Sequence, residues 1–415
     1  MFEKVALDNG LRLMVEPMES VRSVTVGIWI KCGSRYESTD RHGVSHLLEH
    51  MLFKGTDTRT AKDIAEQVDS IGGHLNAFTS KEYTCIYLKV IDDHFETALE
   101  ILSDMYFNSK FSEDELQKER QVIVEELKMY EDTPDEYVHD LLLEACYGQH
   151  ELAHNILGDR DSIVDLSSEV LTNHHQSHFL PEKTVVSVSG NIEYQRAYNF
   201  VDKLFGKFPY QDKGETIVTD IPDYQTGRIV KKKDTEQVHY CLAFPGVPVT
   251  SKNLYHLGLL NNILGGSMSS KLFQEIREVN GLCYAVYSYY LNFIDSGLFV
   301  IYAGFSPENF SDTNEKIWDI INNVKVGSIT QQELQRSKEQ VKGNILMGLE
   351  STSNRMARLG RDELLKERIL TYDEIINLIE QVTVEELTSM AQNIFQKDKS
   401  AVSVIGPVSD SEIPV

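Results

Sequence analysis

Hydrophobic and polar residues follow two different periods along the first part of the chain. Short runs rich in β-branched and aromatic residues predict strands, whereas longer runs with apolar residues three and four positions apart predict helices. Ser112-Glu113-Asp114-Glu115 is a capping box, which marks the start of a helix. The pattern predicts strands at Leu11–Val15, Val24–Ile30, His74–Ser80 and Tyr83–Val90, and helices at Gly43–Phe53, Ala61–Ile71, Asp92–Asn108 and Ser112–Tyr130.

The order of these signals recurs in the second part of the chain. Around Tyr210–Arg228 the composition turns polar and the periodicity is lost, which indicates a linker. Beyond this segment, Gly265-Gly266 separates an apolar helix from a further helix. The recurring elements are strands at Val238–Phe244, Tyr284–Tyr290 and Gly297–Phe305, and the apolar helix at Leu254–Leu264.

The recurrence predicts two domains of similar fold. A chain of 415 residues is long enough for two domains, each with its own core. We expect the domains at 1–212 and 229–415, joined by a linker at 213–228. Each should be of the α+β class, with helices packed on a mainly antiparallel sheet. A shift of 210 positions places Leu259 and Leu260 opposite Glu49 and His50, so the second copy should lack the polar residues of the first.

The composition is that of an ordinary soluble protein, with 41% hydrophobic and 25% charged residues. No run approaches the roughly 18 apolar residues that span a membrane, and the start, Met1-Phe2-Glu3-Lys4, does not resemble a secretion signal. The cysteines are odd in number and form no C-x-x-C pair, which predicts reduced thiols in a cytoplasmic protein rather than disulfides or a thiolate metal site. They are Cys32, Cys85, Cys146, Cys241 and Cys283.

The charge of the chain narrows the class of partner. The 40 basic and 64 acidic residues give a formal charge of −24. We therefore expect no nucleic acid partner, because phosphate binding requires a basic face. Such a field would attract a cationic ligand, although plain solubility explains the charge equally well.

The segment His46-Leu47-Leu48-Glu49-His50 carries the most informative chemistry. On a helix, residues four apart lie on one face, so both imidazoles can reach a single metal ion. The spacing is the H-x-x-E-H motif, in which the glutamate is a proton carrier, and it points to a zinc hydrolase. The alternative is a surface helix with two unrelated histidines.

A third metal ligand must come from elsewhere, because zinc in hydrolases takes three protein ligands. The predicted helix at Ser112–Tyr130 offers Glu119, Glu125 and Glu126. Glu119 and Glu126 are seven positions apart and share one helix face. A charged helix produces such spacings by chance, so the choice among the three stays open on spacing alone.

Several further segments resemble one protein family. His46 to Thr56 reads His-Leu-Leu-Glu-His-Met-Leu-Phe-Lys-Gly-Thr, and Glu126 follows His50 by 76 positions. Asn76-Ala77-Phe78-Thr79 after Gly72-Gly73, and Arg277 to Tyr284, match as well. Together they resemble the insulinase/pitrilysin family of metallopeptidases, with the closest similarity to the catalytic (β-type) subunit of mitochondrial processing peptidase and its bacterial homologues. The resemblance extends over nearly the whole chain.

The resemblance implies a role for each residue of the metal site. His46, His50 and Glu126 become the ligands of one zinc ion per chain, and Glu49 becomes the general base. Glu119 becomes a carboxylate that orients a histidine ligand. Two neutral imidazoles and one carboxylate leave zinc with net positive charge, which favours ionisation of water.

The resemblance also implies substrate contacts in the first domain. His74–Ser80 would be an edge strand to which an extended peptide adds, with Asn76 and Ala77 beside the scissile bond. Phe53 would form an apolar wall for the residue after that bond. The alternatives are an interior strand with an incidental asparagine and a core aromatic ring.

Two residue pairs would contribute specificity and transition-state contacts. Arg277 and Tyr284 match a pair that reaches substrate from the second domain; alternatively, Arg277 caps a helix that Gly281 ends and Tyr284 packs in a strand. Glu136 and Asp140, at i and i+4, match positions that hold a basic side chain before the cleavage point. A solvated acidic face is the competing interpretation.

The expected function is zinc-dependent endopeptidase cleavage of extended peptides or unfolded protein segments. The resemblance implies that the two domains form a clam-shell chamber, and that the chain acts as a homodimer in the cytoplasm without membrane contact. Two other classes stay open. One is a non-catalytic scaffold or core-type subunit of a hetero-oligomer, and the other is a metal-dependent hydrolase of a different substrate, such as an amidase.

Overall fold

The chain forms two compact units, each with a hydrophobic core of its own. A computed structural model describes residues 2–208, 220–366 and 368–412. Among the described residues, the first unit takes those of Met1–Lys128, His154–Thr219 and Met347–Ile369. The second takes those of Met129–Ala153, Asp220–Leu346 and Leu370–Val415.

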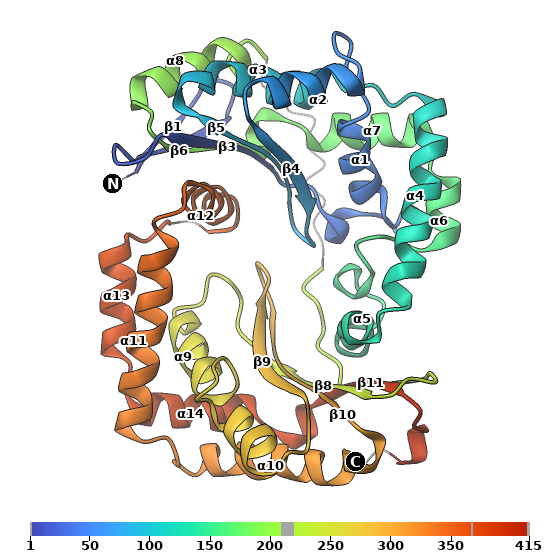
Figure 1. The fold of residues 1–415 in the computed structure, drawn as a ribbon, viewed down its shortest axis with the longest axis vertical. Coiled ribbons are helices and arrows are strands. Elements are labelled where there is room, and N and C mark those ends of the chain that lie inside the picture. The colour runs from blue at the N-terminus through green and yellow to red at the C-terminus, as the bar shows by residue number, and fades with distance from the viewer. Residues whose placement is uncertain (1, 209–219, 367, 413–415) are drawn as a thin grey trace. The chain divides into compact units, whose positions relative to one another are not determined.

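The first unit is built on a six-stranded, mainly antiparallel sheet with β4 at one edge (Figure 1). Only β2 and β6 run parallel to each other. The strands are, in order across the sheet, β1 (Glu3–Ala6), β2 (Arg12–Pro17), β6 (Thr184–Gly190), β3 (Ser23–Ile30), β5 (Thr84–Ile91) and β4 (His74–Thr79).

The second unit repeats this arrangement with five strands. Again one neighbouring pair, β7 with β11, is parallel and the others are antiparallel. The order is β7 (Arg228–Lys232), β11 (Ala401–Gly406), β8 (Val238–Pro245), β10 (Gly297–Phe305) and β9 (Ala285–Asn292). The shared order confirms the predicted fold class of two similar α+β domains.

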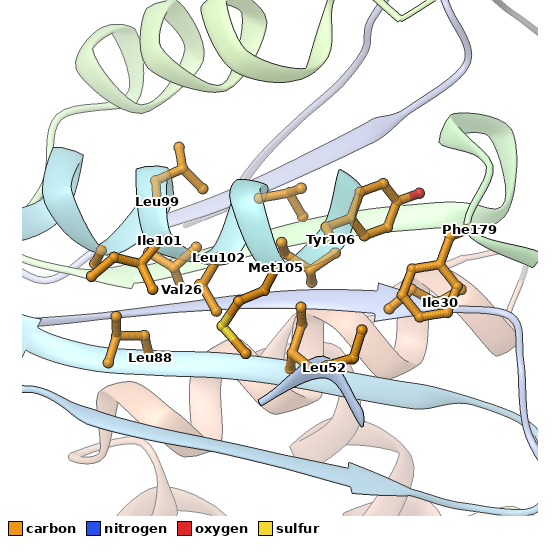
Figure 2. Packing of buried hydrophobic residues seen from close by; sticks show 14 of the residues in the cluster. Val26, Ile30, Leu52, Leu88, Leu99, Ile101, Leu102, Met105, Tyr106 and Phe179 are labelled. Carbon is orange, nitrogen blue, oxygen red and sulfur yellow. The ribbon is translucent and has the colours of Figure 1, made fainter. Parts of the chain in front are cut away.

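The core of the first unit lies between its sheet and the helices above one face. On α3 the apolar residues recur at helical spacing, so the helix buries one side. Figure 2 shows Leu102 and Met105 of α3 above Val26 of β3 and Leu88 of β5. The helices of this unit are α1 (Val44–Leu52), α2 (Ala61–Ser70), α3 (Phe95–Asn108), α4 (Glu113–Glu131), α6 (Arg160–Asp165), α7 (Ser168–His178), α8 (Tyr194–Phe205) and α12 (Thr352–Leu365).

The second unit has an equivalent core. Its helices are α5 (Pro134–Tyr147), α9 (Leu254–Leu264), the π-helix η5 (Phe273–Val279), α10 (Phe310–Lys325), α11 (Gln331–Gly348), α13 (Tyr372–Gln381) and α14 (Val384–Ile394). The predicted helix at Leu254–Leu264 and strand at Gly297–Phe305 coincide with α9 and β10. No helix of the described residues has both the length and the apolar character needed to cross a bilayer.

The domains were expected at 1–212 and 229–415, but two helices belong to the unit other than the one that this division gives them. Helix α5 belongs to the second unit, where Val138, Leu142 and Cys146 pack in one cluster with Cys241 and Ala243 of β8. Helix α12 belongs to the first unit and lies on the sheet face opposite α3 (Figure 1). Each helix has an apolar side that is buried on the sheet to which it is assigned. The expected linker at 213–228 lies outside the described residues from 213 to 219.

Close approach of α12 to the sheet depends on two glycines. A Cβ at Gly27 of β3 would overlap Met356, and one at Gly360 of α12 would overlap the Trp29 indole. Trp29 is fully buried, and its Nε1–H donates to Ser187 Oγ at 2.9 Å. The indole therefore fills the space that the two glycines leave.

Gly360→Ala should destabilise the first unit, because the added methyl group would overlap the Trp29 indole. Overpacking costs about 1–3 kcal/mol, whereas alanine gains only about 1 kcal/mol of helix propensity over glycine. Thermal unfolding should therefore occur at a lower temperature. Gly348→Ala is the control, since this glycine ends α11 and its methyl would meet only Asn354 Nδ2, at 3.8 Å. Equal melting curves for both variants would contradict the close packing of α12.

Candidate metal centre

Helix α1 is held by its apolar side and by a buried carboxylate at its start. Glu37 accepts from the backbone N–H groups of Gly43 and Ser45, both at 2.8 Å, and so satisfies free donors of the first turn. Burial raises the pKa of Glu37 to about 7. The side chains of Val44, Leu47, Leu48, Met51 and Leu52 are buried at helical spacing.

This burial directs the polar residues of the H-x-x-E-H motif to the other side of α1. The rings of His46 and His50 lie with their centroids 4.6 Å apart. His46 is buried, while Glu49 and His50 are partly exposed. The predicted helix is confirmed, and the two imidazoles lie close together on it.

Helix α4 presents Glu119 and Glu126 from the stripe that faces the core. Leu116, Glu119 and Ile123 are buried along this stripe, and Glu126 continues it. Glu125 points away, with its side chain 71% exposed and its Oε1 2.7 Å from Lys128 Nζ. Of the three glutamates that spacing left as candidate ligands, the structure thus places Glu119 and Glu126 on the core-facing stripe and Glu125 toward solvent.

The ring of His50 is bracketed by these two glutamates. Its Nδ1 lies 3.1 Å from Glu119 Oε2, and its Nε2 lies 3.8 Å from Glu126 Oε2. Glu119 also contacts Lys54 Nζ at 2.6 Å, which fixes the carboxylate. Because Nδ1–H donates to Glu119, the lone pair of Nε2 is directed toward Glu126.

The three predicted ligands fit a metal ion. One ligand atom from each of His46, His50 and Glu126 lies within 4.8 Å of the other two. Two electron-pair donors, His50 Nε2 and a Glu126 oxygen, face each other, which favours a cation between them. Burial lowers the pKa of His46 to about 3, so the ring is neutral, which is the form that binds zinc. Its Nδ1 is buried and lacks a hydrogen-bond partner among the described residues.

Glu49 lies between the histidines on α1 and is held by strand β4. The hydroxyl of Thr79 donates to Glu49 Oε2 at 2.6 Å. Burial raises the pKa of Glu49, which makes its carboxylate a stronger base than an exposed one. The hydrogen bond leaves the second carboxylate oxygen to interact with other groups.

Strand β4 is the edge of its sheet, and no further strand flanks it in the described part of the chain. Asn76 is exposed on this strand, and its Oδ1 accepts from the N–H of Ala77 at 2.8 Å. Phe53 is half-buried beside the core. It shares a groove of about 560 Å³ with residues of α2 and with His74, Leu75, Asn76 and Tyr87.

Arg277 and Tyr284 lie together in the second unit. The guanidinium of Arg277 sits over the rings of Phe273, at 4.9 Å, and Tyr284, at 5.4 Å. Tyr284 is 74% exposed and precedes β9, so it does not pack inside a strand. The positions that the repeat aligns with the motif, Leu259 and Leu260, are buried in α9.

Glu136 and Asp140 also belong to the second unit, on α5. Glu136 is exposed and Asp140 is half-buried. Tyr130 donates its hydroxyl to the backbone carbonyl of Glu136 at 3.3 Å. Burial, and then the neighbouring charge of Asp140, raises the pKa of Tyr130. The two carboxylates thus produce a local negative potential.

Sequence reasoning missed Lys54, Thr79 and a second cluster of Cys32, His174 and His178. Lys54 is one turn beyond His50, and Thr79 is the last residue of β4, one position before the end of the predicted strand; neither had been assigned a role in the site. The cluster had a signal in the i, i+4 spacing of His174 and His178, although the sequence analysis predicted no helix there. All five cysteines are free and buried.

Comparisons with known proteins identify the family of the chain. The family model described as insulinase (peptidase family M16) matches residues 12–160, and the model described as peptidase M16 inactive domain matches residues 165–341. A Bacillus subtilis protein named uncharacterized zinc protease YmxG is 45% identical over 98% of both chains. An uncharacterized zinc protease of Streptomyces coelicolor is 36% identical over 99% of this chain and 90% of its own.

Two solved structures share the fold. A protease from Helicobacter pylori has a TM-score of 0.93 at 24% identity, covering 98% of this chain and 99% of its own. A structure titled peptidase M16 inactive domain, from Pseudomonas fluorescens, has a TM-score of 0.90 at 20% identity, with 98% of both chains covered.

Glu126→Gln should weaken zinc retention, because a neutral amide is a poorer ligand for a dication than a carboxylate. Removal of a residue that only hydrogen-bonds to a metal ligand costs about 10–100-fold in metal affinity, and the loss here should be at least as large. Elemental analysis after dialysis against a chelator measures it. Glu125→Gln is the matched control on the same helix, since Glu125 contacts Lys128 and faces solvent. Full zinc occupancy in Glu126→Gln would identify another residue as the third ligand.

Proposed function

The chain belongs to the insulinase family of peptidases (M16), and on this basis we propose that it is a zinc-dependent endopeptidase of extended peptides or unfolded protein segments. The observation that supports this most directly is that ligand atoms of His46, His50 and Glu126 lie within 4.8 Å of one another. Glu49 lies on α1 between the two histidines. We assign these three residues as ligands of one zinc ion per chain.

Glu49 is the proposed general base. Zinc, when bound, would act as a Lewis acid that polarises the substrate carbonyl and lowers the pKa of water. Glu49 takes a proton from that water and returns it to the leaving amine. Thr79 holds one carboxylate oxygen at 2.6 Å, so the base keeps one orientation.

Glu119 and Lys54 are proposed to orient the ligand His50 without binding the metal ion themselves. The carboxylate of Glu119 fixes the His50 ring through Nδ1, and Lys54 holds the carboxylate from its other oxygen. An anchored ring loses less conformational entropy when its Nε2 binds a metal ion. We therefore assign Glu119 and Lys54 as positioning residues.

Strand β4 is the proposed binding site of the substrate backbone. An extended peptide adds to a free strand edge through backbone hydrogen bonds, and a folded segment has no free backbone to offer. Asn76 and Ala77 lie on this edge. The groove beside Phe53 has the volume for an apolar side chain of the peptide, next to the same strand. This arrangement favours peptides over the small amides of an amidase.

Arg277 and Tyr284 are proposed to donate hydrogen bonds to bound substrate. Tyr284 is exposed, and the guanidinium of Arg277 lies over its ring. The Tyr284 hydroxyl and the N–H groups of Arg277 therefore remain available to a bound peptide. The complete set of motif residues favours an enzyme over a non-catalytic scaffold. The second half supplies no ligands, because Leu259 and Leu260 stand where the motif residues would lie.

The finer assignment is a processing peptidase that acts near basic residues. Glu136 and Asp140 would bind a Lys or Arg side chain before the scissile bond, and the charge of −24 would favour cationic peptides. We further propose that the chain acts as a homodimer in the cytoplasm, as the resemblance to two-chain family members implies.

Glu49→Gln should abolish peptide hydrolysis while zinc stays bound. Glutamine keeps the shape of glutamate but cannot take up a proton, a role worth roughly 100- to 10,000-fold in rate. The measurement is kcat on a fluorogenic peptide library, together with zinc content. Glu125→Gln should retain wild-type rates. A Glu49→Gln enzyme with more than about a tenth of wild-type kcat would exclude Glu49 as the base.

Charge reversal at Glu136 and Asp140 should reduce the preference for peptides with a basic residue before the cleaved bond. An exposed ion pair contributes about 1 kcal/mol or less, so the ratio of kcat/KM for basic over neutral peptides should fall by about 5-fold at most. The control is Glu131→Lys with Glu144→Lys, which changes the net charge equally. If both double variants show the same cleavage profile, Glu136 and Asp140 do not determine the preference for a basic residue before the cleaved bond.

A further inference from the structure

A second group of metal-binding side chains lies in the first unit, on different elements from the first. Cys32 follows β3, and His174 and His178 lie one turn apart on α7. One sulfur or nitrogen atom from each lies within 4.8 Å of the other two. Cys32 is fully buried and His178 is 4% exposed.

The contacts of His178 leave one ring nitrogen free. Its Nδ1 lies 3.0 Å from the carbonyl oxygen of His174 and 3.1 Å from Ser177 Oγ. Its Nε2 is buried and has no hydrogen-bond partner within the described residues. Since Nδ1–H donates to the carbonyl, Nε2 carries a lone pair that receives no proton. A buried acceptor without a donor costs free energy, so it calls for an explanation.

Cys32 and His174 are already at the separation of two ligands of one ion. Cys32 Sγ lies 3.2 Å from His174 Nε2. Zinc holds sulfur at about 2.3 Å and nitrogen at about 2.0–2.1 Å, so two tetrahedral ligands lie about 3.5 Å apart. The two rings on α7 have centroids 4.2 Å apart, which allows both to turn toward the same point.

Hydrogen bonding alone accounts for only part of this cluster. Ser45 Oγ lies 3.1 Å from His174 Nε2 and 3.7 Å from Cys32 Sγ, so these three groups satisfy one another. They offer nothing to Nε2 of His178. A metal ion would use this lone pair together with the sulfur and the His174 nitrogen.

We propose that Cys32, His174 and His178 form a second metal site, for zinc or a similarly thiophilic divalent ion, distinct from the site of His46, His50 and Glu126. A thiolate and two imidazoles are a ligand set that zinc accepts, and Ser45 Oγ is adjacent for the fourth position. When the ion binds, a sulfur–metal bond replaces the S–H bond of Cys32, and the thiol proton leaves to solvent.

The proposed role is to fix the start of α1. Ser45 is in the first turn of this helix and directly precedes His46. A metal ion bound between the end of β3 and α7, with Ser45 beside it, would tie three elements together. Metal sites of this closed, buried type stabilise folds rather than activate water.

Cobalt distinguishes the two sites, because only the second contains sulfur. Chelator-stripped full-length protein is titrated with Co²⁺ alone, and absorption is followed in the near ultraviolet, where thiolate-to-cobalt charge transfer appears. We expect this band in the wild type, and a further equivalent of bound Co²⁺ beyond that held by the first site. Absence of the band would overturn the proposal.

Variants assign the band to its ligands. Cys32→Ser and His178→Gln should each abolish it and remove the further equivalent, with circular dichroism checking that each variant is folded. Cys146→Ser, a buried free thiol in the second unit, is the control and should leave the band unchanged. A band that survives in either folded variant, or that disappears in Cys146→Ser, would contradict the assignment.

The test is independent of the proposed peptidase activity. The double variant His46→Ala with His50→Ala should lose the first site but keep the thiolate band. Peptide hydrolysis by the wild type is measured separately, so an inactive protein with the band would affect only the proposed function. Loss of the band in a folded double variant would show that the cluster is not a separate site.

Discussion

The hydrogen bond between Glu119 and His50 determines how the rest of the candidate metal centre is arranged. An imidazole on a helix can turn about its last side-chain bond, and only one orientation directs Nε2 toward Glu126. Glu119 selects this orientation by accepting from Nδ1, and Lys54 in turn fixes Glu119. The cost of burying the Glu119 carboxylate is offset by two charge-assisted contacts. The position of a ligand is therefore set by a residue two turns away from Glu126 on the same helix.

Local periodicity predicted about half of the strands and helices that the structure describes, and it did not predict how they assemble. Helix α9 and strand β10 coincide with their expected ranges, because each carries a strong apolar pattern between clear breaks. Strands β6 and β11 were not predicted, and each pairs in parallel with a strand from the other end of its half. The assignments of α5 and α12 were also missed. Such pairings arise from contacts between distant segments, which periodicity does not encode.

The same limit applies to the candidate sites. The i, i+4 spacing on α1 predicted a face shared by His46 and His50, and the seven-residue spacing on α4 offered Glu119 and Glu126 as one candidate pair. Spacing did not separate Glu126 from Glu125; burial of the Leu116 and Ile123 stripe does. The contact of Thr79 with Glu49 links a strand to a helix, and the Cys32 cluster links a strand end to α7. Both depend on the tertiary fold, so neither could be read from one segment.

Placement of α12 in the first unit has a consequence for synthesis of the protein. Trp29 contacts Met356, which is 327 residues later in the chain. At about 5–20 residues per second, translation leaves the Trp29 face of the nascent sheet without its helix for roughly 15–65 seconds. During that interval an apolar surface and a free strand edge at β4 are exposed together, the combination that promotes aggregation. The first unit, which carries the candidate metal centre, therefore completes the packing of its sheet only when the chain is nearly finished.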